Sequence, residues 1–418
     1  MFKFIHAADL HIDSPLEGLE QYEGAPVEHL RGATRRAFEN LVDLSLDEQV
    51  DFVVLAGDLY DGDWKDYNTG LFFTNQMHRL REAKIHAFVV YGNHDAESQM
   101  TRSLRLPDNV HAFKSSHPET KTLESLGVAV HGQSFASRAV TADLSAAYPS
   151  RISSLFNIGM LHTCAGGYDG HKPYAPTTVD ALRSRGYDYW ALGHVHRREV
   201  LRQDPWIVFP GNIQGRHIRE TGPKGCTVVT VRDAQVVSAE HRDLDVLRWE
   251  VCRVKADGAD TPADLLDRIQ RALADQVAAS DGRLTAMRLE VAGPCRAHHA
   301  LTANPTHWHN EIRSLASSLG ERAWLEKIKL RTSSDLQLDE MSKREDVIGG
   351  LFRSLQRIDE NDDTLLELAG LFTDLQVKLP AELREGNEPL DFRSPTLLRG
   401  ALNEARELLI TRLLHGGA

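Results

Sequence analysis

Five short groups of polar residues in the amino-terminal half of the chain have the residue types of a metal site. They are Asp9-x-His11, Gly57-Asp58, Gly92-Asn93-His94-Asp95, His162-Thr163 and Gly193-His194-x-His196. Each group follows an apolar stretch of the sequence. An asparagine offers a neutral oxygen to a metal ion, and an aspartate offers a charged one. A histidine can bind a metal or move a proton near neutral pH. These residue types therefore predict metal-assisted or acid–base chemistry.

Each group by itself also has an ordinary structural explanation. Polar residues after a strand usually form a turn, and a lone histidine such as His162 is more often a hydrogen-bonded residue than a ligand. Gly-His-x-His is more specific, because alternate residues of an extended segment point the same way, so His194 and His196 can approach one site. The recurrence of five groups at successive strand ends favours a common site over coincidence.

The apolar stretches predict the elements that position these groups. Strands are predicted over residues 2–11, 51–58, 85–90, 128–130, 156–161, 187–192 and 206–209, with a hairpin of 227–231 and 235–239 and helices over 29–48 and 69–82. Alternating strands and helices with polar residues at the strand ends are typical of a layered α/β domain, whose ligands bind at those ends. We expect this domain to occupy residues 1–245.

The remainder of the chain has a different character, because it lacks further acid–histidine groups. Strands over 248–254, 284–291 and 323–330 and helices over 262–277 and 309–319 predict a small α+β domain at residues 246–332. Residues 333–418 are predicted to be helical. The last predicted helix carries an apolar stripe from Leu397 to Leu409, which could bind a partner or pack on the chain's own core.

Composition limits the function classes. The formal net charge of −12 over 418 residues argues against an unaided, charge-driven nucleic-acid binder, although a chain that collects aspartate ligands is also made acidic. Four scattered cysteines without C-x-x-C spacing indicate a reducing compartment. The sequence has no apolar run of about 18 residues, and its start lacks the features of a secretory signal. We therefore expect a cytoplasmic protein without membrane contact.

The candidate ligands suit two metal ions better than one. They are Asp9, His11, Asp58, Asn93, His94, His162, His194 and His196. Mixed carboxylate, imidazole and amide ligands suit Mn²⁺, Fe²⁺ or Zn²⁺. Two ions that share one carboxylate can clamp a phosphate and generate a hydroxide near neutral pH. Asp58 follows a middle strand and is the natural shared ligand.

The order of these groups resembles the calcineurin-like metallophosphoesterase superfamily. Three further segments resemble the SbcD and YhaO-type DNA repair exonucleases, and YhaO most of all. They are A-G-D-L-Y-D at residues 56–61, P-G-N-I-Q-G-R-H at 210–217 and E-T-G-P-K-G at 220–225. The resemblance covers residues 1 to about 245, and the rest of the chain matches in layout only. It implies a layered metallophosphoesterase β-sandwich flanked by helices, with a small α+β capping domain and a helical carboxyl-terminal region.

The resemblance also assigns roles to individual residues. One metal would take Asp9, His11, Asp58 and His196, and the other would take Asp58, Asn93, His162 and His194. A metal-activated hydroxide would attack phosphorus, and His94 would assist the leaving oxygen. Asp95 would hydrogen-bond His94 and fix its tautomer. The family further implies Mn²⁺, DNA as substrate of an exonuclease (with endonuclease activity open), and an SMC-like coiled-coil ATPase of the SbcC/YhaN type as partner. A homodimer is open as well.

Three arginines are candidates for contact with a nucleic acid, and two alternative functions remain open. Arg197, Arg198 and Arg216 could contact a nucleic-acid backbone, but solvated loops explain them about as well. A small-molecule phosphodiesterase or phosphatase of the same superfamily is one alternative, and the acidic charge favours it. A scaffold subunit that gates an SMC-like ATPase is the other.

Overall fold

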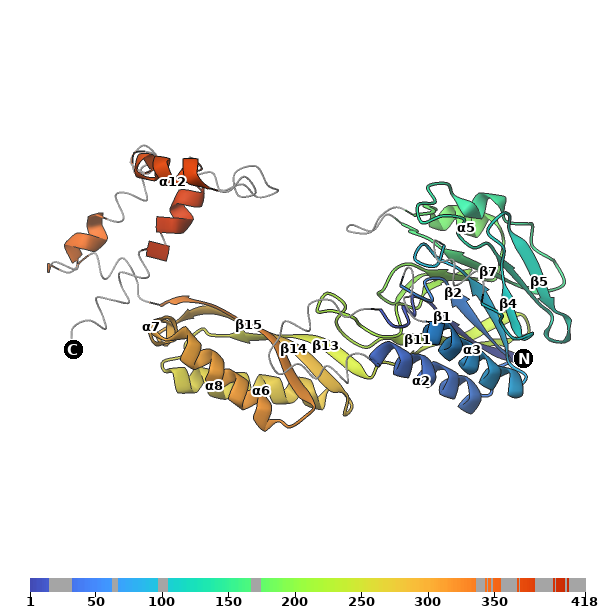
Figure 1. The fold of residues 1–418 in the computed structure, drawn as a ribbon, viewed down its shortest axis with the longest axis horizontal. Helices are drawn as coiled ribbons and strands as arrows, with labels where there is room; N and C mark the ends of the chain where they lie inside the picture. The colour runs from blue at the N-terminus through green and yellow to red at the C-terminus, as the bar shows by residue number, and fades with distance from the viewer. Residues whose placement is uncertain are drawn as a thin grey trace. The chain divides into compact units, whose positions relative to one another are not determined.

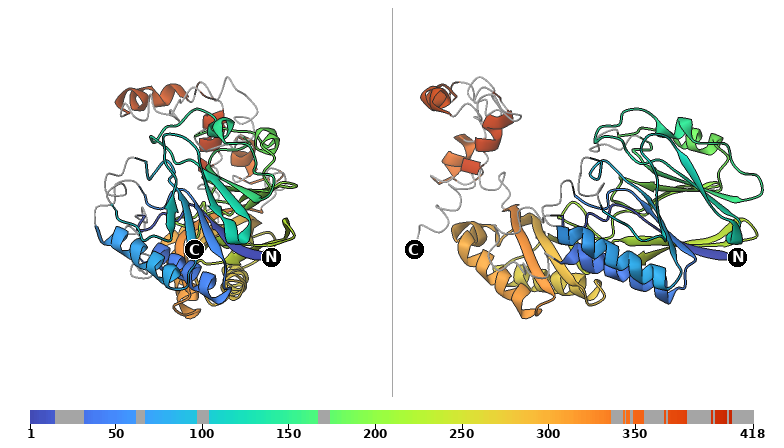
Figure 2. Two further views of the ribbon diagram at one scale, coloured as in Figure 1. Left: turned by 90° about the vertical axis from the view of Figure 1, so that its right-hand side faces the viewer. Right: turned by 45° about the vertical axis from the view of Figure 1, so that its right-hand side comes forward.

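The computed structural model describes residues 1–14, 32–61, 67–96, 104–166 and 174–335, together with parts of 343–405 (Figures 1 and 2). The chain forms two compact units. The first comprises Met1–Cys252, Ala274–Arg288 and Leu319–Lys327, and the second comprises Arg253–Leu273, Leu289–Ser318 and Ile328–Ala418. Parts of the helices predicted beyond residue 335 are described: residues 349–354, 369–378 and 396–402 are helical, and further parts lie outside the described residues.

One six-stranded sheet carries the first three strand-end groups. Its order is β12 (Gln235–Asp243), β11 (Gly225–Arg232), β1 (Phe2–Ala7), β2 (Phe52–Ala56), β3 (His86–Val90) and β4 (Val110–Ala112). Strands β1 to β4 are parallel, whereas β11 and β12 form the predicted hairpin and pair antiparallel to β1. All five residues of β2 are buried, as expected for a central parallel strand covered on both faces.

A second six-stranded sheet carries the remaining two groups. Its order is β5 (Glu119–Leu123), β6 (Val128–Gly132), β7 (Phe156–His162), β8 (Tyr189–Gly193), β10 (Trp206–Phe209) and β9 (Glu199–Gln203). The two sheets pack face to face through an apolar core that includes Phe4, Phe52 and Phe88 from the first sheet and Ile158 and Tyr189 from the second. The predicted β-sandwich is therefore confirmed.

Helices cover the outer faces of the sandwich (Figure 1). Helices α2 (Ala33–Asp47) and α3 (Tyr67–Glu82) pack on the first sheet, where Phe38 and Phe73 join the core formed with Val53 and Leu55. On the second sheet, Leu182 of the short helix α5 (Val179–Ser184) packs with Trp190. The flanking helices expected for this fold are present.

A third, smaller sheet follows the sandwich in the sequence. Its order is β13 (Leu247–Lys255), β14 (Leu284–Cys295) and β15 (Ala323–Ser334), and its helices are α6 (Pro262–Ala278), α7 (His298–Ala303) and α8 (Pro305–Ser318). The strands and helices predicted for this region are thus present, and β15 runs slightly past residue 333, where helix was predicted. Further on, the described residues include a helical turn, Gly370–Phe372, and helix α12 (Thr373–Lys378).

Some elements differ from the prediction. Strand β1 ends at Ala7, because Asp9 and His11 both have positive φ angles, which an extended strand does not allow. The edge strands β4, β5 and β9 were not predicted, because they are short, partly exposed and polar. In the part of the chain that the structure describes, none of the helices has the length and apolarity needed to cross a membrane.

Candidate metal centre

The five polar groups meet at the carboxyl ends of strands from both sheets. Asp9 and His11 follow β1, Asp58 follows β2, Asn93 and His94 follow β3, His162 ends β7, and His194 and His196 follow β8. Backbone hydrogen bonds join the first two loops, since the amides of Asp9 and His11 donate to the carbonyls of Gly57 and Asp58, both at 3.0 Å. His162 joins the two sheets, because its Nδ1 lies 3.0 Å from the carbonyl oxygen of Ala56.

Four of the candidate ligands have an unusual backbone conformation. The φ angles are 53° at Asp9, 43° at His11, 50° at Asp58 and 103° at His194. L-residues rarely adopt such angles, and they persist where surrounding interactions enforce them, often at functional sites. At His194 the enforcing interaction is clear, because its amide donates to both carboxylate oxygens of Asp9, at 3.1 and 3.0 Å.

The first cluster comprises Asp9, His11 and His196, whose ligand atoms all lie within 4.8 Å of one another. The Nε2 atoms of His11 and His196 face each other at 3.2 Å, and Oδ1 of Asp9 is 3.8 Å from the latter. Nδ1 of His196 pairs with Glu220 at 2.7 Å, whereas Nδ1 of His11 is buried without a hydrogen-bond partner among the described residues. A cation bound by the two facing Nε2 atoms and by Asp9 would suit the spacing of these three atoms.

The second cluster comprises Asp58, His162 and His194, again with ligand atoms within 4.8 Å. Asn93 belongs to it as well, since Oδ1 of Asn93 lies 3.0 Å from Nε2 of His162, and Oδ2 of Asp58 lies 3.3 Å from the same nitrogen. Two ligands that are each about 2.1 Å from one ion and at right angles lie about 3 Å apart. The spacing of these three atoms therefore fits the coordination shell of a divalent ion.

Asp58 faces both clusters. Its Oδ2 is also 4.0 Å from Nε2 of His11, and its Oδ1 accepts the amide hydrogen of His94 at 3.0 Å. Burial alone would raise the pKa of Asp58, but the adjacent His162 and His11 hold it well below its usual range. Conversely, burial opposes the charge on His162, yet Asp58 raises the pKa of His162 to about 9. The electrostatics thus favour an ionised carboxylate at the centre of the site, as a shared metal ligand requires.

His94 lies beside the clusters and has its own acidic partner. Nδ1 of His94 pairs with Oδ1 of Asp61 at 2.7 Å, and the His94 side chain is 30% exposed. Burial lowers the pKa of His94, but the hydrogen bond to Asp61 and the charge of Asp58 outweigh it and raise the pKa overall. A third group of potential metal ligands, His11, Asp61 and His94, also has its atoms within 4.8 Å. Asp61 ends the A-G-D-L-Y-D segment, but its contact with His94 was not predicted from the sequence.

The predicted hydrogen bond between Asp95 and His94 is wrong. The carboxylate of Asp95 is buried and accepts three backbone N–H groups, from Leu59 at 3.1 Å, Tyr60 at 3.0 Å and Gly92 at 2.9 Å. These donors belong to the loops after β2 and β3, which would otherwise leave them unsatisfied. Asp95 therefore fastens the two loops that carry Asp58 and Asn93, and the support of His94 comes from Asp61.

Of the three arginines predicted to contact phosphate, only Arg216 reaches the site. Its guanidinium lies 3.5 Å from Asp61 and 3.3 Å from Glu220, and its side chain is 14% exposed. Arg197 is exposed and pairs with Glu199, and half-buried Arg198 donates to the carbonyl of Ala239 in β12. Glu220 was missed as a site residue, although its segment had been noted, because its contact with His196 depends on a long loop.

The models of two protein families match this chain. The calcineurin-like phosphoesterase family matches residues 2–198, and the middle domain of the metallophosphoesterase YhaO matches residues 249–333. The amino-terminal part of the chain, residues 2–198, matches the calcineurin-like phosphoesterases. The resemblance predicted from the strand-end groups is therefore confirmed.

Individual proteins are similar to larger parts of this chain. The uncharacterized metallophosphoesterase YhaO of Bacillus subtilis strain 168 is 38% identical over 271 residues, which is 64% of this chain and 66% of that protein, slightly less than two thirds. The DNA double-strand break repair protein Mre11 of Methanopyrus kandleri is 24% identical over 93% of this chain and 84% of that protein. A crystal structure of a Thermus thermophilus protein aligns with a TM-score of 0.34 at 12% identity, over 57% of this chain and 98% of that chain.

Proposed function

We propose that this chain is a two-metal-dependent DNA nuclease that hydrolyses phosphodiester bonds during DNA repair, mainly as an exonuclease. The observation that carries the proposal is the pair of buried ligand clusters on either side of Asp58, with His94 next to them. DNA as the substrate is supported by the relatives named DNA double-strand break repair proteins, from Methanopyrus kandleri and Saccharolobus solfataricus.

The donor set fits two divalent ions, and we propose Mn²⁺. Asp9, His11, Asp58 and His196 would hold one ion, and Asp58, Asn93, His162 and His194 would hold the other. Bound there, the ions would supply Lewis acidity toward phosphoryl oxygens and a hydroxide near neutral pH. The mixture of carboxylate, amide and imidazole ligands in the clusters supports an ion of intermediate softness over Ca²⁺ or Mg²⁺.

His94 is the proposed general acid. Asp61 engages Nδ1 of His94, which leaves Nε2 to donate a proton to the departing sugar oxygen. The raised pKa of His94 favours the protonated ring that this role needs. Arg216, which contacts Asp61 from the other side, adds a positive charge that can attract the substrate phosphate.

An SMC-like coiled-coil ATPase is the proposed partner, bound by the helices of residues 333–418. Within the described part of this region, Ala369 and Leu398 form a small apolar cluster with Leu402. Phe372 and Leu375 nearby in the sequence are 43% and 49% exposed, and exposed apolar side chains of this size support a binding role. A homodimer is part of the same proposal.

A substrate panel tests the function. Purified protein with Mn²⁺ is incubated with linear double-stranded DNA, single-stranded DNA and bis(p-nitrophenyl) phosphate, with and without the ATPase. We expect both DNA and the ester to be cut. His94→Ala should keep two metals per chain and lose most turnover, whereas Asp58→Asn should lose both metals and all activity.

Each other outcome has a distinct meaning. If only the small ester is cut, in a reaction that His94→Ala abolishes, the chain is a small-molecule phosphodiesterase, which the net charge of −12 would suit. If nothing is cut although two metals are bound, the nuclease proposal fails and a scaffold role for the ATPase gains support. If His94→Ala empties a metal site, His94 is a ligand and its proposed role is wrong.

A further inference from the structure

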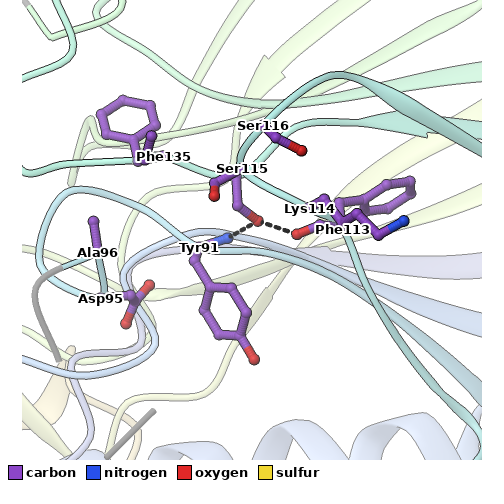
Figure 3. Close-up of a pocket in the computed structure, with 10 residues that line it drawn as sticks. Tyr91, Asp95, Ala96, Phe113, Lys114, Ser115, Ser116 and Phe135 are labelled. Atoms are coloured by element: carbon purple, nitrogen blue, oxygen red, sulfur yellow. Dashed lines mark hydrogen bonds between the residues drawn. The ribbon is translucent and has the colours of Figure 1, made fainter. Parts of the chain in front are cut away.

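A pocket of about 550 Å³ lies at the carboxyl edge of the sandwich, beside the metal centre (Figure 3). The three loops that follow β3, β4 and β6 form this pocket. The lining residues are Tyr91, Asp95, Ala96, Phe113, Lys114, Ser115, Ser116, Ser134, Phe135 and Ala136. None of the candidate metal ligands is among them, so the pocket is a separate compartment from the two clusters.

A single side chain separates this pocket from a candidate ligand. The ring of Phe135 packs edge-to-face against His162, with 5.5 Å between the ring centroids. Asp95 forms another part of the wall, and its carboxylate holds the amides of Leu59 and Gly92 in the loops of Asp58 and Asn93. A ligand in the pocket would therefore be separated from the second cluster by the ring of Phe135.

The lining is mixed in a way that suits a flat, mostly neutral ligand. Ala96, Phe113 and Phe135 supply apolar or aromatic lining, whereas the ring of Tyr91 is directed away from them and packs against the core of the first sheet (Figure 3). The exposed Ser115 and Ser116 add hydroxyl groups. The two charged groups of the lining are engaged. Asp95 accepts three backbone N–H groups, and the exposed ammonium of Lys114 pairs with Glu119 at 2.9 Å.

The walls of the pocket are also held rigidly. The Ser134 hydroxyl donates to the carbonyl of Phe113 at 2.7 Å and accepts the amide hydrogen of Tyr91 at 3.0 Å, which ties the three loops together (Figure 3). The amide of Phe135 donates to the carbonyl of Tyr91 at 2.9 Å. A pre-formed cavity of this volume is typical of small-ligand sites, which are usually about 300–1,000 Å³.

We infer that this pocket holds the nucleobase and sugar of the nucleotide whose phosphate is hydrolysed at the metal centre. The inference rests on the proposed phosphodiesterase function. Contact between a base and aromatic side chains tolerates any base, because every base has a π face. The serine hydroxyls can hydrogen-bond the sugar or the base edge. The pocket thus favours nucleotidyl esters over simple phosphodiesters without selecting a sequence.

The test compares two chromogenic esters that differ in the nucleoside. Thymidine 5′-(p-nitrophenyl phosphate) carries a nucleoside, and methyl p-nitrophenyl phosphate carries a methyl group in its place. Wild-type protein with Mn²⁺ should show a kcat/KM at least tenfold higher for the thymidine ester. Ser115→Trp, which fills the pocket from its exposed side, should lower that preference at least tenfold, mainly through KM. Ala136→Trp is a second filling variant at another exposed lining position.

Matched controls and a DNA arm complete the design. Ser184→Trp places the same side chain at an exposed serine of α5, outside the lining, and should keep the wild-type preference. An oligonucleotide with an ordinary or an abasic terminal nucleotide shows whether the pocket serves DNA ends. If wild-type protein prefers the ordinary terminal nucleotide over the abasic one and Ser115→Trp removes this preference, the pocket serves DNA ends. If wild-type protein shows no such preference, the pocket serves free nucleotides.

The outcomes separate this inference from the proposed function. If wild-type protein cuts both esters equally well, or both filling variants keep the wild-type ratio while melting at the wild-type temperature, the pocket does not bind the nucleoside, although the phosphodiesterase function stands. If wild-type protein with two bound metals cuts neither ester, the proposed function itself fails.

Discussion

At the scale of single residues, three imidazoles of the site are oriented by partners on their outer nitrogen. Asp61 engages Nδ1 of His94, Glu220 engages Nδ1 of His196, and the Ala56 carbonyl engages Nδ1 of His162. Such partners fix the tautomer and the ring orientation, so that Nε2 is directed to the site. The ligand types could be predicted from sequence, but these partners could not. Asp95 illustrates the reason: it is adjacent to His94 in the sequence, but the loop after β3 directs its carboxylate to backbone amides and away from the His94 ring.

The partner of His94 gives the first prediction. Asp61→Asn should lower kcat for a phosphodiester about 10- to 100-fold, because the amide cannot support a protonated imidazole as the carboxylate does. KM should change little, since Asp61 is not a proposed ligand of the substrate. Steady-state kinetics with Mn²⁺ measure both constants, and equilibrium dialysis counts the bound metal.

The matched control is Asp43→Asn, which removes an exposed carboxylate that pairs with Arg79 on the surface. It should leave kcat and metal content at wild-type values. Loss of one metal in Asp61→Asn would instead mean that the group of His11, Asp61 and His94 holds an ion.

Gly92 gives a second prediction, which concerns space. A Cβ atom on Gly92 would lie 2.3 Å from Oδ1 and 2.8 Å from the amide nitrogen of Asp58, and such contacts do not occur in folded proteins. Gly92→Ala should therefore displace Asp58 and weaken Mn²⁺ binding at least tenfold, which titration calorimetry measures.

Gly127→Ala provides the comparison for Gly92. Gly127 has a φ of +66°, and an added Cβ would meet no atom within 4 Å. We expect this variant to lose about 1 kcal/mol of unfolding free energy from backbone strain alone and to bind metal normally. Equal metal affinities in the two variants would show that Gly92 is not needed to place Asp58.

At the scale of secondary structure elements, buried strands were predicted well, whereas three of the four edge strands of the two large sheets, β4, β5 and β9, were not. β2 and β3 are continuous apolar runs between polar residues, which is the pattern of a covered parallel strand. β5 and β9 contain no fully buried residue, and most of their residues are polar, so their sequences resemble those of loops. The division of the strands into two sheets depends on long-range pairing, such as β1 with β11, which periodicity does not encode.

One buried histidine connects these two sheets and gives a prediction for stability. His6 of β1 lies 3.0 Å from the Tyr189 hydroxyl and 3.1 Å from the Leu192 carbonyl of β8, and burial lowers its pKa to about 3. The unfolded chain, with a pKa near 6.5, takes up the proton first as the pH falls. This contribution to stability is therefore present above pH 6.5 and is lost as the pH decreases toward 3.

His6→Gln should remove this dependence while keeping a donor and an acceptor. Between pH 7 and pH 5, the wild type should lose about 2 kcal/mol more unfolding free energy than the variant. Urea unfolding in EDTA measures this for both proteins without metal, and His117→Gln, at an exposed position, should behave as the wild type. Parallel pH curves for the wild type and His6→Gln would show that His6 is not responsible.

At the scale of the whole molecule, part of the negative charge of the chain lies on buried carboxylates that bound cations would neutralise. The chain carries a formal net charge of −12, and two of its buried carboxylates, Asp9 and Asp58, lie in the ligand clusters. Burial raises the pKa of Asp9, which indicates that its charge is unfavourable without a compensating cation. All candidate ligands belong to the first compact unit, and none belongs to the second.

The folded first unit should therefore be stabilised by Mn²⁺ through mass action, since the unfolded chain has no assembled site. At a free concentration 100 times the dissociation constant, each independent site should add about 2.7 kcal/mol to the free energy of unfolding. Calorimetry should show the transition of the first unit moving to higher temperature with Mn²⁺, and a separate transition of the second unit staying in place. Asp58→Asn should abolish the shift, and Asp43→Asn should retain it. An unfolding temperature that does not respond to Mn²⁺, or a shift that survives in Asp58→Asn, would contradict a shared two-metal site centred on Asp58.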